Sequence, residues 1–267
     1  MFKRLKMLFG RKGSEKAYRL LEFPFNFYAL LLSKYGEVRY LHYGFWDSDS
    51  DISILTAQER LAERLYGLIP QGVHSILDVG CGLGTSVCEL LHRGYDPEGI
   101  SPDEGLVNYA KATHKKCADR FYITTFEEYK REKQYDLLLF CESAQYIKDK
   151  QVLFSRAKNL LRLGGYTLLC DEFLKRFDER ANFHIVSDFI GYAEREGFEI
   201  MVLQEITQNV IKTRYVFYDA LAAQYDKVIK HIHEDTLKEF IYRWRIHSNM
   251  YEDGTIGYFI VLMRLRD

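Results

Sequence analysis

Three closely spaced glycines follow a short apolar run at Ile76-Leu77-Asp78-Val79-Gly80-Cys81-Gly82-Leu83-Gly84. A buried strand that leads through glycines into a helix lets the backbone turn tightly and approach a ligand at the carboxyl end of a sheet. The helix that follows offers free N–H groups to an anionic group. Asp78 and the turn carbonyls can take an ammonium group. This turn therefore predicts a binding site for a ligand that contains an amino-acid moiety.

The spacing of these glycines disfavours a nicotinamide dinucleotide as that ligand. The dinucleotide pattern is G-x-G-x-x-G/A, which from Gly80 requires Gly or Ala at position 85, and the residue there is Thr85. An NAD-dependent oxidoreductase is therefore the weaker interpretation.

An alternation of apolar runs and helical patterns surrounds this turn. Helical patterns of about ten residues between strands are typical of a parallel sheet covered on both faces. Tyr135–Cys141 is a continuous apolar run, as expected of a strand buried on both faces. A helix over 150–161, ended by Gly164 and Gly165, precedes one of the strands. The seven expected strands cover residues 75–80, 97–101, 121–125, 135–141, 166–171, 198–207 and 255–265.

Two helical regions interrupt this alternation. Residues 17–68 read as helix rich in aromatic side chains, broken at Gly36 and at residues 41–46, and two long helical patterns span 214–250. We expect an α/β fold with a doubly wound, mostly parallel seven-stranded sheet, a helical N-terminal cap and a helical insertion before the last strand. One domain then covers residues 1–267: the cap is 1–70, the ligand-binding core is 71–207 and 254–267, and the insertion is 208–253.

Together these segments resemble the class I S-adenosylmethionine-dependent methyltransferases. LDVGCGLGT (77–85) is similar to their first motif, and Gly99-Ile100-Ser101-Pro102 and Leu161-Arg162-Leu163-Gly164-Gly165 are similar to later ones. LHYGFWD (41–47) looks like the HYGYW segment of small-molecule methyltransferases of the tocopherol and natural-product types and, more distantly, of cyclopropane fatty acid synthases. Gly197-Phe198 and Ile206-Thr207-Gln208-Asn209-Val210 look like the GF…ITxNV of that group. The resemblance covers residues 25–265 and implies a Rossmann-like methyltransferase fold.

The resemblance implies S-adenosylmethionine as the cofactor and S-adenosylhomocysteine as its product. Gly80 and Gly82 would lie against the methionine part, and Phe126 would flank the adenine. The ribose-binding acid of the family corresponds to Ser101, and the usual Asp after the third strand corresponds to Thr125. The implied cofactor-binding residues are His42, Tyr43, Asp78, Gly80, Gly82, Ser101, Pro102, Thr125, Phe126 and Cys141.

The expected catalytic base is missing from its usual place. Oxygen acceptors need a proton removed, commonly by a histidine, and many relatives have one in an ESLHH-like segment after the fourth strand. This chain has Glu142-Ser143-Ala144-Gln145-Tyr146 instead. Either His184 serves from across the pocket, or the acceptor is an amine, thiolate or carbon nucleophile that needs no strong base. The candidate catalytic residues are His184, Gln145 and Glu142, and His247 is expected to be solvated.

Composition limits the partners. The chain has 37 basic and 38 acidic residues, so no broad basic field is available to attract nucleic acid. Five scattered cysteines favour free thiols over a disulfide framework or a zinc site, and no long apolar segment or signal peptide is apparent. We expect a cytoplasmic enzyme with a small, apolar or lipid-like acceptor and no metal. The alternatives are a nucleic-acid or protein methyltransferase of the same fold and a cofactor-binding protein without methyl transfer.

The first sixteen residues differ from the rest. They hold six basic residues and one acid, with Phe2, Leu5, Leu8 and Phe9 at helical spacing. A basic amphipathic element of this kind can lie in the headgroup layer of an anionic membrane. One hypothesis is peripheral contact with the inner membrane surface through residues 1–16, and the other is a solvated tail or a lid over the active site.

Overall fold

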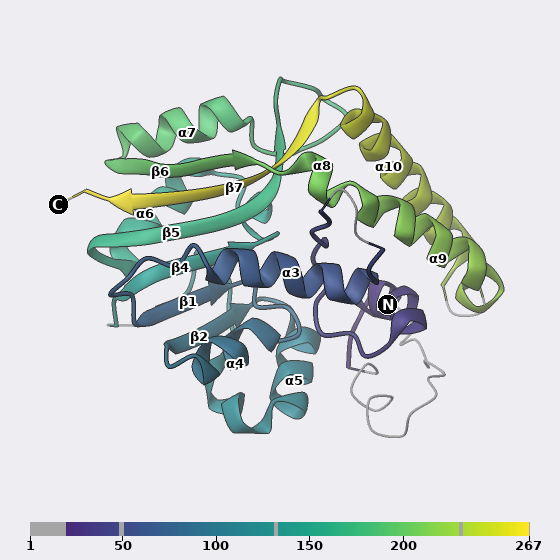
Figure 1. Cartoon of the computed structure of the whole chain (residues 1–267), viewed down its shortest axis with the longest axis horizontal. Coiled ribbons are helices and arrows are strands. Elements are labelled where there is room, and N and C mark those ends of the chain that lie inside the picture. The colour runs from purple at the N-terminus through teal and green to yellow at the C-terminus, as the bar shows by residue number, and fades with distance from the viewer. Residues whose placement is uncertain (1–19, 48–50, 131–132, 230–231, 267) are drawn as a thin grey trace.

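Seven strands form a single sheet in the order β3-β2-β1-β4-β5-β7-β6 (Figure 1). The computed structural model describes residues 20–47, 51–130, 133–229 and 232–266. β7 runs antiparallel to both of its neighbours, and the other neighbouring strands are parallel. The strands are β1 (Ser75–Val79), β2 (Asp96–Ser101), β3 (Phe121–Ile123), β4 (Tyr135–Cys141), β5 (Leu161–Leu174), β6 (Phe198–Glu205) and β7 (Ile256–Leu265).

Helices cover both faces of the sheet, as the apolar run of β4 predicts. Leu138 and Phe140 pack in a cluster with α6 and α7, whereas Leu137 and Leu139 pack on the opposite face with α3. Successive side chains of a strand point to opposite faces, so β4 contributes to two cores. The helices over the sheet are α3 (Ile54–Tyr66), α4 (Thr85–His92), α5 (Glu104–Thr113), α6 (Lys150–Leu160) and α7 (Val186–Arg195), and the short 3₁₀ helices are η1 (Ser33–Tyr35), η2 (Lys115–Arg120) and η3 (Ala144–Tyr146).

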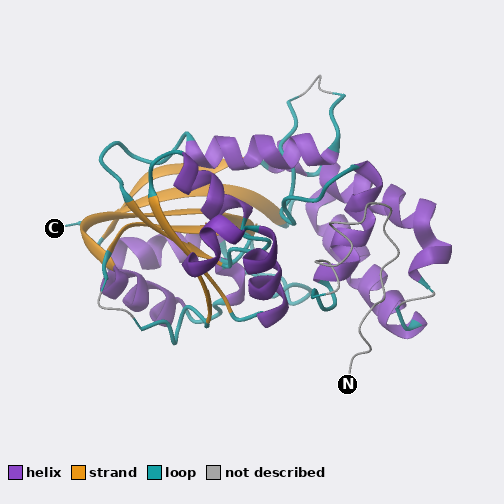
Figure 2. Ribbon diagram, turned by 90° about the horizontal axis from the view of Figure 1, so that it is seen from below, coloured by secondary structure: helices purple, strands orange, loops and turns teal. Residues whose placement is uncertain are grey.

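A second group of helices stands beyond the carboxyl ends of the parallel strands. These are α2 (Phe25–Leu32), α9 (Lys212–Val228) and α10 (Glu234–Glu252), with the short α8 (Thr207–Val210) leading into α9. Figure 2 shows these helices at the opposite end of the molecule from the C-terminus. Aromatic rings join them: Phe27 contacts Phe240 at 5.0 Å and Tyr28 contacts Phe217 at 5.5 Å between centroids. The insertion and the cap therefore pack on each other rather than only on the sheet.

The expected fold class is confirmed, and most of the expected elements lie where the sequence placed them. The boundary between α6 and β5 differs from the expectation. The helix expected over 150–161 ends at Leu160, and β5 begins at Leu161, five residues before the expected start at 166. Leu161 pairs with Tyr135 of β4, and a register shift follows between Tyr135 and Leu137. The two glycines therefore lie inside the irregular start of the strand and do not end the helix.

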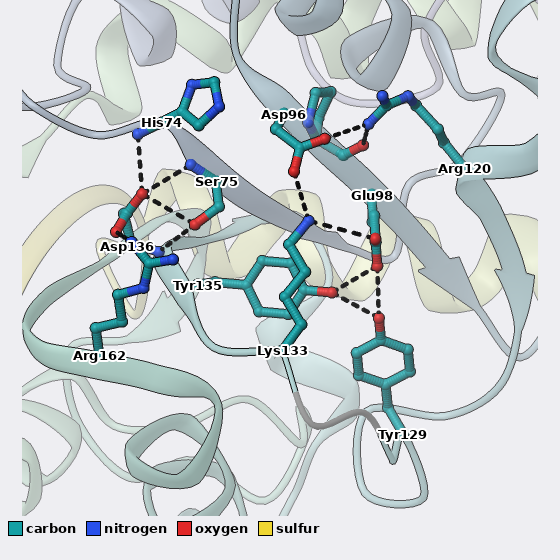
Figure 3. A network of polar contacts seen from close by, with 11 residues as sticks. His74, Ser75, Asp96, Glu98, Arg120, Tyr129, Lys133, Tyr135, Asp136 and Arg162 are labelled. Carbon is teal, nitrogen blue, oxygen red and sulfur yellow. Dashed lines mark hydrogen bonds and ion pairs between the residues drawn. The ribbon is translucent and has the colours of Figure 1, made fainter.

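A polar network ties together the amino ends of β2 and β4 (Figure 3). The hydroxyls of Tyr129 and Tyr135 donate to the buried carboxylate of Glu98, with oxygen–oxygen distances of 2.9 and 2.6 Å. Lys133 lies 2.7 Å from a carboxylate oxygen of Asp96 and 3.4 Å from one of Glu98. This network lies at the amino edge of the parallel strands, opposite the edge at which ligands bind in such sheets.

Two cysteines differ from the expectation of five free thiols. Cys88 in α4 and Cys117 in η2 form a disulfide, with their Cα atoms 6.1 Å apart. The crossover through α5 brings η2 back against α4, although 29 residues separate the two cysteines in sequence. Within the described residues we find no cluster of side chains suited to a metal ion and no helix long and apolar enough to cross a membrane.

Candidate active site

A cavity of about 900 Å³ lies at the carboxyl ends of β1, β2 and β4, and residues of α2, α9 and α10 also line it. Its size is that of a typical ligand site. It brings together twelve of the thirteen residues that the sequence singled out. These are His42, Tyr43, Asp78, Gly80, Gly82, Ser101, Pro102, Thr125, Phe126, Cys141, Glu142 and Gln145.

The glycine turn (residues 80–84) forms one end of this cavity. Gly80, Gly82 and Gly84 all have positive φ angles, of 78°, 52° and 81°, which side chains disfavour. A Cβ on Gly80 would lie 2.5 Å from the Cβ of Ser143, whereas one on Gly82 would meet no atom within 4 Å. Gly80 is therefore required by close packing, and Gly82 leaves open space for a ligand.

Asp78 is a buried carboxyl group at the same end. It is 3% exposed, and no hydrogen bond or ion pair to its side chain is found among the described residues. Burial raises its pKa from the ordinary value to about 7. A buried charge without a partner is unfavourable, so Asp78 favours a ligand that brings a positive charge or a donor.

The carboxyl ends of β2 and β3 line the next part of the cavity. Ser101 ends β2, and its hydroxyl accepts a bond from the backbone N–H of Asp103 at 3.2 Å. Asp103 caps α5 by accepting from the N–H of Leu106 at 2.8 Å. Phe126 is buried edge-on against Phe140, with centroids 5.3 Å apart. This part therefore presents short polar groups and one buried aromatic ring.

The cap segment (residues 39–46) closes the cavity from the side of the cap. Gln58 of α3 donates to the carbonyl of His42 at 2.6 Å, and Gly44 donates its N–H to the hydroxyl of Thr213 at 3.0 Å. A Cβ on Gly44 would lie 2.5 Å from the Cβ of Ala57, so only glycine allows this contact with α3. The segment is therefore fixed to α3 and to the insertion at once.

His42 is neutral at physiological pH. Burial lowers the pKa of its ring to about 4, and its Nδ1 lies 2.7 Å from the carbonyl oxygen of Tyr43. Its ring also packs on Tyr40 at 4.7 Å between centroids. These contacts suit His42 to shape the cavity and to form hydrogen bonds there rather than to carry charge.

Glu142 follows the last residue of β4 and faces the middle of the cavity. Its Oε1 accepts the backbone N–H of Tyr43 at 2.6 Å and the hydroxyl of Tyr258 at 2.7 Å. Burial raises its pKa to about 8; Glu172 and Asp171 nearby also raise it, while the two hydrogen bonds oppose the rise. A carboxyl group with a pKa near neutrality is suited to accept and release a proton.

A second polar centre joins the insertion to the sheet. Arg214 of α9 is 3% exposed, donates to the hydroxyl of Tyr43 at 2.6 Å, and lies 3.8 Å from a carboxylate oxygen of Glu172. The hydroxyl of Tyr251 donates to the same oxygen of Glu172 at 2.8 Å. Asp171, which precedes Glu172 in the sequence, accepts a hydrogen bond from the backbone N–H of Gln145 at 3.0 Å. Burial raises the pKa of Asp171 to about 7.

The far end of the cavity is mainly aromatic. We call its five aromatic side chains from the cap and the insertion the aromatic wall. Tyr28 and Trp244 lie at its centre, and their rings approach edge to face at 6.4 Å. The wall consists of Phe25, Tyr28, Phe217, Phe240 and Trp244. Such a surface binds apolar or aromatic ligands and keeps water out.

His184 is the one predicted site residue that does not line the cavity. Its Nε2 lies 2.9 Å from the carbonyl oxygen of Ile147, and its ring packs on Phe189 at 5.3 Å between centroids. The carbonyl of Ile147 therefore engages one ring nitrogen of His184, and the role of His184 as a base stays a prediction. His247 of α10, expected to be solvated, lines the cavity instead and packs on Phe183 at 5.2 Å.

Several cavity residues carry no signal in the sequence. Arg214 and Trp244 lie in helical patterns that do not differ from ordinary core-packing helices. Glu172 lies near the carboxyl end of the apolar strand β5, which is a weak indication of a site at that edge. Tyr28 reaches the cavity only because α2 packs on α9 and α10.

Residues 77–169, which include the glycine turn and Glu142, match the family described as "Methyltransferase domain". The chain carries a class I S-adenosylmethionine-dependent methyltransferase domain. Among curated proteins it is similar to the methyltransferase GfsG of Streptomyces halstedii, with 20% identity over 83% of this chain and 85% of the relative. Other curated methyltransferases match over a shorter segment, and the chain spans 38% to 42% of their length.

Solved methyltransferase-like structures share the whole fold. The [4+2]-cyclase SpnF superposes with a TM-score of 0.75 at 18% identity and covers 94% of this chain and 97% of its own. The mycolic acid cyclopropane synthase CmaA1, crystallised with S-adenosylhomocysteine and CTAB, gives a TM-score of 0.73 at 17% identity, with 94% of each chain covered. At this identity the likeness shows the fold alone.

S-adenosylmethionine is the cofactor of this methyltransferase domain, and the cavity residues fit it. The open space at Gly82 accommodates a ligand backbone, and the unpaired carboxyl group of Asp78 suits the ammonium of the methionine part. Ser101 and Asp103 offer polar groups for the ribose, and Phe126 an apolar surface for the adenine. The family's ribose-binding acid is replaced by Ser101, which can form a hydrogen bond but brings no charge.

Proposed function

We propose that this methyltransferase transfers a methyl group from S-adenosylmethionine to a small, apolar or lipid-like acceptor. One observation carries the proposal: the cavity that begins at the glycine turn continues without a break to the aromatic wall. One end suits the cofactor, and the other end offers a dry, apolar surface. Phe240 and Trp244, 5.4 Å apart, would hold the body of the acceptor.

The cofactor supplies an electrophilic methyl group when it is bound, so the protein mainly has to align the acceptor and exclude water. The cap segment and the aromatic wall enclose the cavity and would do both. Glu142 and Gln145 lie between the two ends and would contact the reacting atom of the acceptor. His42 and Tyr43 would close over the cofactor. These roles follow from position in the cavity.

We also propose that the chain is one domain, in which residues 1–70 cap the cofactor and residues 208–253 shape the acceptor site. The contacts of α2 with α9 and α10 favour this division. A macromolecular acceptor is the weaker alternative, because the chain has nearly equal numbers of acidic and basic residues. A protein that binds the cofactor without methyl transfer is the second alternative.

Residues 1–16 lie outside the described residues. We propose peripheral membrane contact for them, with the cytoplasmic leaflet as the surface, and the alternative is a solvated tail or a lid over the active site. Six cations next to apolar side chains suit anionic headgroups. Such contact would hold the enzyme where a lipid-like acceptor is dissolved.

The experiment that tests the proposed function is identification of the ligands that co-purify with the protein. Denaturation followed by mass spectrometry should release S-adenosylmethionine or S-adenosylhomocysteine together with an apolar small molecule. A nicotinamide dinucleotide in their place would contradict the proposal. Co-purified nucleic acid that carries methyl groups would favour the macromolecular alternative.

A further inference from the structure

Glu142 has an unusual backbone conformation. It is the only non-glycine residue with a positive φ angle, 55°, in the part of the chain that the structure describes. Such a conformation is unfavourable for a residue with a side chain, and residues of this kind cluster at active sites. The turn places the side chain of Glu142 in the cavity between the glycine turn and the aromatic wall.

The two oxygens of this carboxyl group have different surroundings. Oε1 accepts from the N–H of Tyr43 and from the hydroxyl of Tyr258. For Oε2, no hydrogen bond is found among residues 20–47, 51–130, 133–229 and 232–266. One oxygen therefore anchors the group, and the other is left for a ligand in the cavity.

Glu142 is also adjacent to the part of the cavity assigned to the methionine portion of the cofactor. The hydroxyl of Ser143, the next residue, donates to the carbonyl of Val79 at 2.5 Å. The Cβ of Ser143 also lies 2.5 Å from where a Cβ on Gly80 would be. Glu142 therefore begins the turn that packs directly on the glycine turn, and a positive charge on the methionine portion would act on it.

Charged and titratable groups face Glu142 from every element around it. Glu172 and Asp171 of β5 disfavour its ionised form, and Arg214 of α9 is engaged by Glu172 and Tyr43. Without a ligand, burial and these carboxylates hold the pKa of Glu142 at about 8, so the group is mostly protonated at pH 7. The remaining groups that line this part are Tyr28 from α2, Tyr43 from the cap segment, Cys141 and Tyr146 beside it, His247 from α10 and Tyr258 from β7.

We propose that Glu142 is the catalytic base of the methyl transfer, that the acceptor presents an O–H or N–H group to it, and that the positive charge of the bound cofactor keeps its carboxyl group ionised until the transfer. This inference rests on the proposed function and names the chemical class of its acceptor. Glu142 takes the place of the histidine that is absent after β4.

The step balances in atoms and charge. The acceptor heteroatom uses an electron pair to bond the methyl carbon, and the carbon–sulfur bond breaks with its pair left on the sulfur. The acceptor gives its proton to Glu142. A buried sulfonium–carboxylate pair is thereby replaced by an uncharged thioether and an uncharged carboxyl group, and the loss of two buried charges favours the products.

Calorimetry tests this proposal without an acceptor. S-adenosylmethionine carries a sulfonium cation, whereas S-adenosylhomocysteine carries an uncharged thioether, and both carry the ammonium that Asp78 would take. Titrations at pH 7 in two buffers of different ionisation enthalpy give the number of protons released. We expect S-adenosylmethionine to release more protons than S-adenosylhomocysteine, because only its sulfonium favours the ionised form of Glu142. Any proton released by Asp78 is common to the two ligands and cancels in the comparison. As the pH rises toward 8, the ratio of the two affinities should change in favour of S-adenosylmethionine by up to about tenfold per pH unit.

Three variants assign the released proton. Glu142→Gln keeps a side-chain oxygen for Tyr43 and Tyr258 but cannot ionise, so it should abolish the difference between the two ligands. Glu98→Gln, the same change of a buried carboxyl group at the opposite edge of the sheet (Figure 3), should keep the difference. Glu172→Gln should retain a smaller difference, because Glu172 raises the pKa of Glu142 but is not the group that releases the proton.

Two results would overturn the role of Glu142: equal proton release for both ligands in the wild type, or a difference that disappears in Glu172→Gln and persists in Glu142→Gln. A protein that binds neither ligand would instead contradict the proposed function. The two failures are therefore distinguishable.

Discussion

The backbone N–H of Tyr43 lies 2.6 Å from Oε1 of Glu142, although 99 residues separate them in sequence. Tyr43 belongs to the cap segment, which lines the cavity, and its hydroxyl contacts Arg214 of the insertion at 2.6 Å. One residue therefore joins the cap, the candidate base and the acceptor side of the cavity.

Gly82→Asp should abolish cofactor binding. The new side chain would enter the open space at Gly82 and place a second negative charge beside Asp78. Gly94→Asp is the matched control, because Gly94 also has a positive φ angle and open space but does not line the cavity. Calorimetry with S-adenosylhomocysteine should show binding in the control only. Unchanged affinity in Gly82→Asp would place the cofactor elsewhere.

Arg214→Met should lower the free energy of unfolding by about 3–5 kcal/mol, the usual cost of leaving a buried charge without its partner. The group that loses its positively charged partner is the carboxylate of Glu172, which is 9% exposed. The measurement is denaturant-induced unfolding monitored by circular dichroism. Addition of Glu172→Gln should restore part of the loss, and strict additivity of the two changes would show that the pair is not coupled.

The stability of the ligand-free protein should fall as the pH rises from 6.5 to 8. Burial raises the pKa of Glu142 to about 8 and those of Asp78 and Asp171 to about 7. The folded state therefore holds protons that the unfolded state has already lost, and folding becomes less favourable as these groups ionise. The histidine pKa values that burial lowers, such as that of His42, act in the opposite direction only below about pH 6.5.

Thermal unfolding in this pH range measures the effect. Glu142→Gln should reduce the fall in melting temperature, because it removes one of the three groups. A melting temperature that rises between pH 6.5 and 8 in the wild type would contradict the raised pKa values.

Residues 1–16 should bind anionic membranes. The full chain should sediment with phosphatidylserine-containing vesicles at low salt and be released as the salt concentration rises, since each cation contributes roughly 1 kcal/mol at the surface. A chain that starts at Ala17 should stay in solution. Equal sedimentation of the two proteins would remove the membrane hypothesis. Loss of cofactor affinity in the shortened protein would indicate a lid instead.

The sequence predicted the sheet and the cofactor end of the cavity because both depend on local patterns. The apolar run of β4 and the glycines before α4 specify a strand, a turn and a helix from neighbouring residues alone. The acceptor end depends on contacts between distant helices. Trp244 packs in a cluster with residues of α2 and α9, and Arg214 contacts Tyr43 of the cap segment and Trp244 of α10. Single-residue patterns give no signal for such contacts.

The catalytic base was also difficult to predict from the sequence, because its identity depends on contacts in the folded chain. His184 looked suitable because it lies just before α7. In the structure, its Nε2 lies within hydrogen-bond distance of the carbonyl oxygen of Ile147. Glu142 was one candidate among three, and its backbone conformation and free oxygen became apparent only in the folded chain. The Cys88–Cys117 pair was missed for a related reason, since it forms between elements brought together by the α5 crossover.

The most direct test of the account is transfer of a labelled methyl group. The protein is incubated with S-adenosylmethionine labelled in its methyl group and with separate lipid, polar small-molecule, protein and nucleic-acid fractions from cells. We expect label in a compound extracted into organic solvent, a rate lower by about 10²–10⁴-fold in Glu142→Gln, and an unchanged rate in His184→Gln. Label in the protein or nucleic-acid fraction, or no transfer by a protein that binds the cofactor, would contradict it.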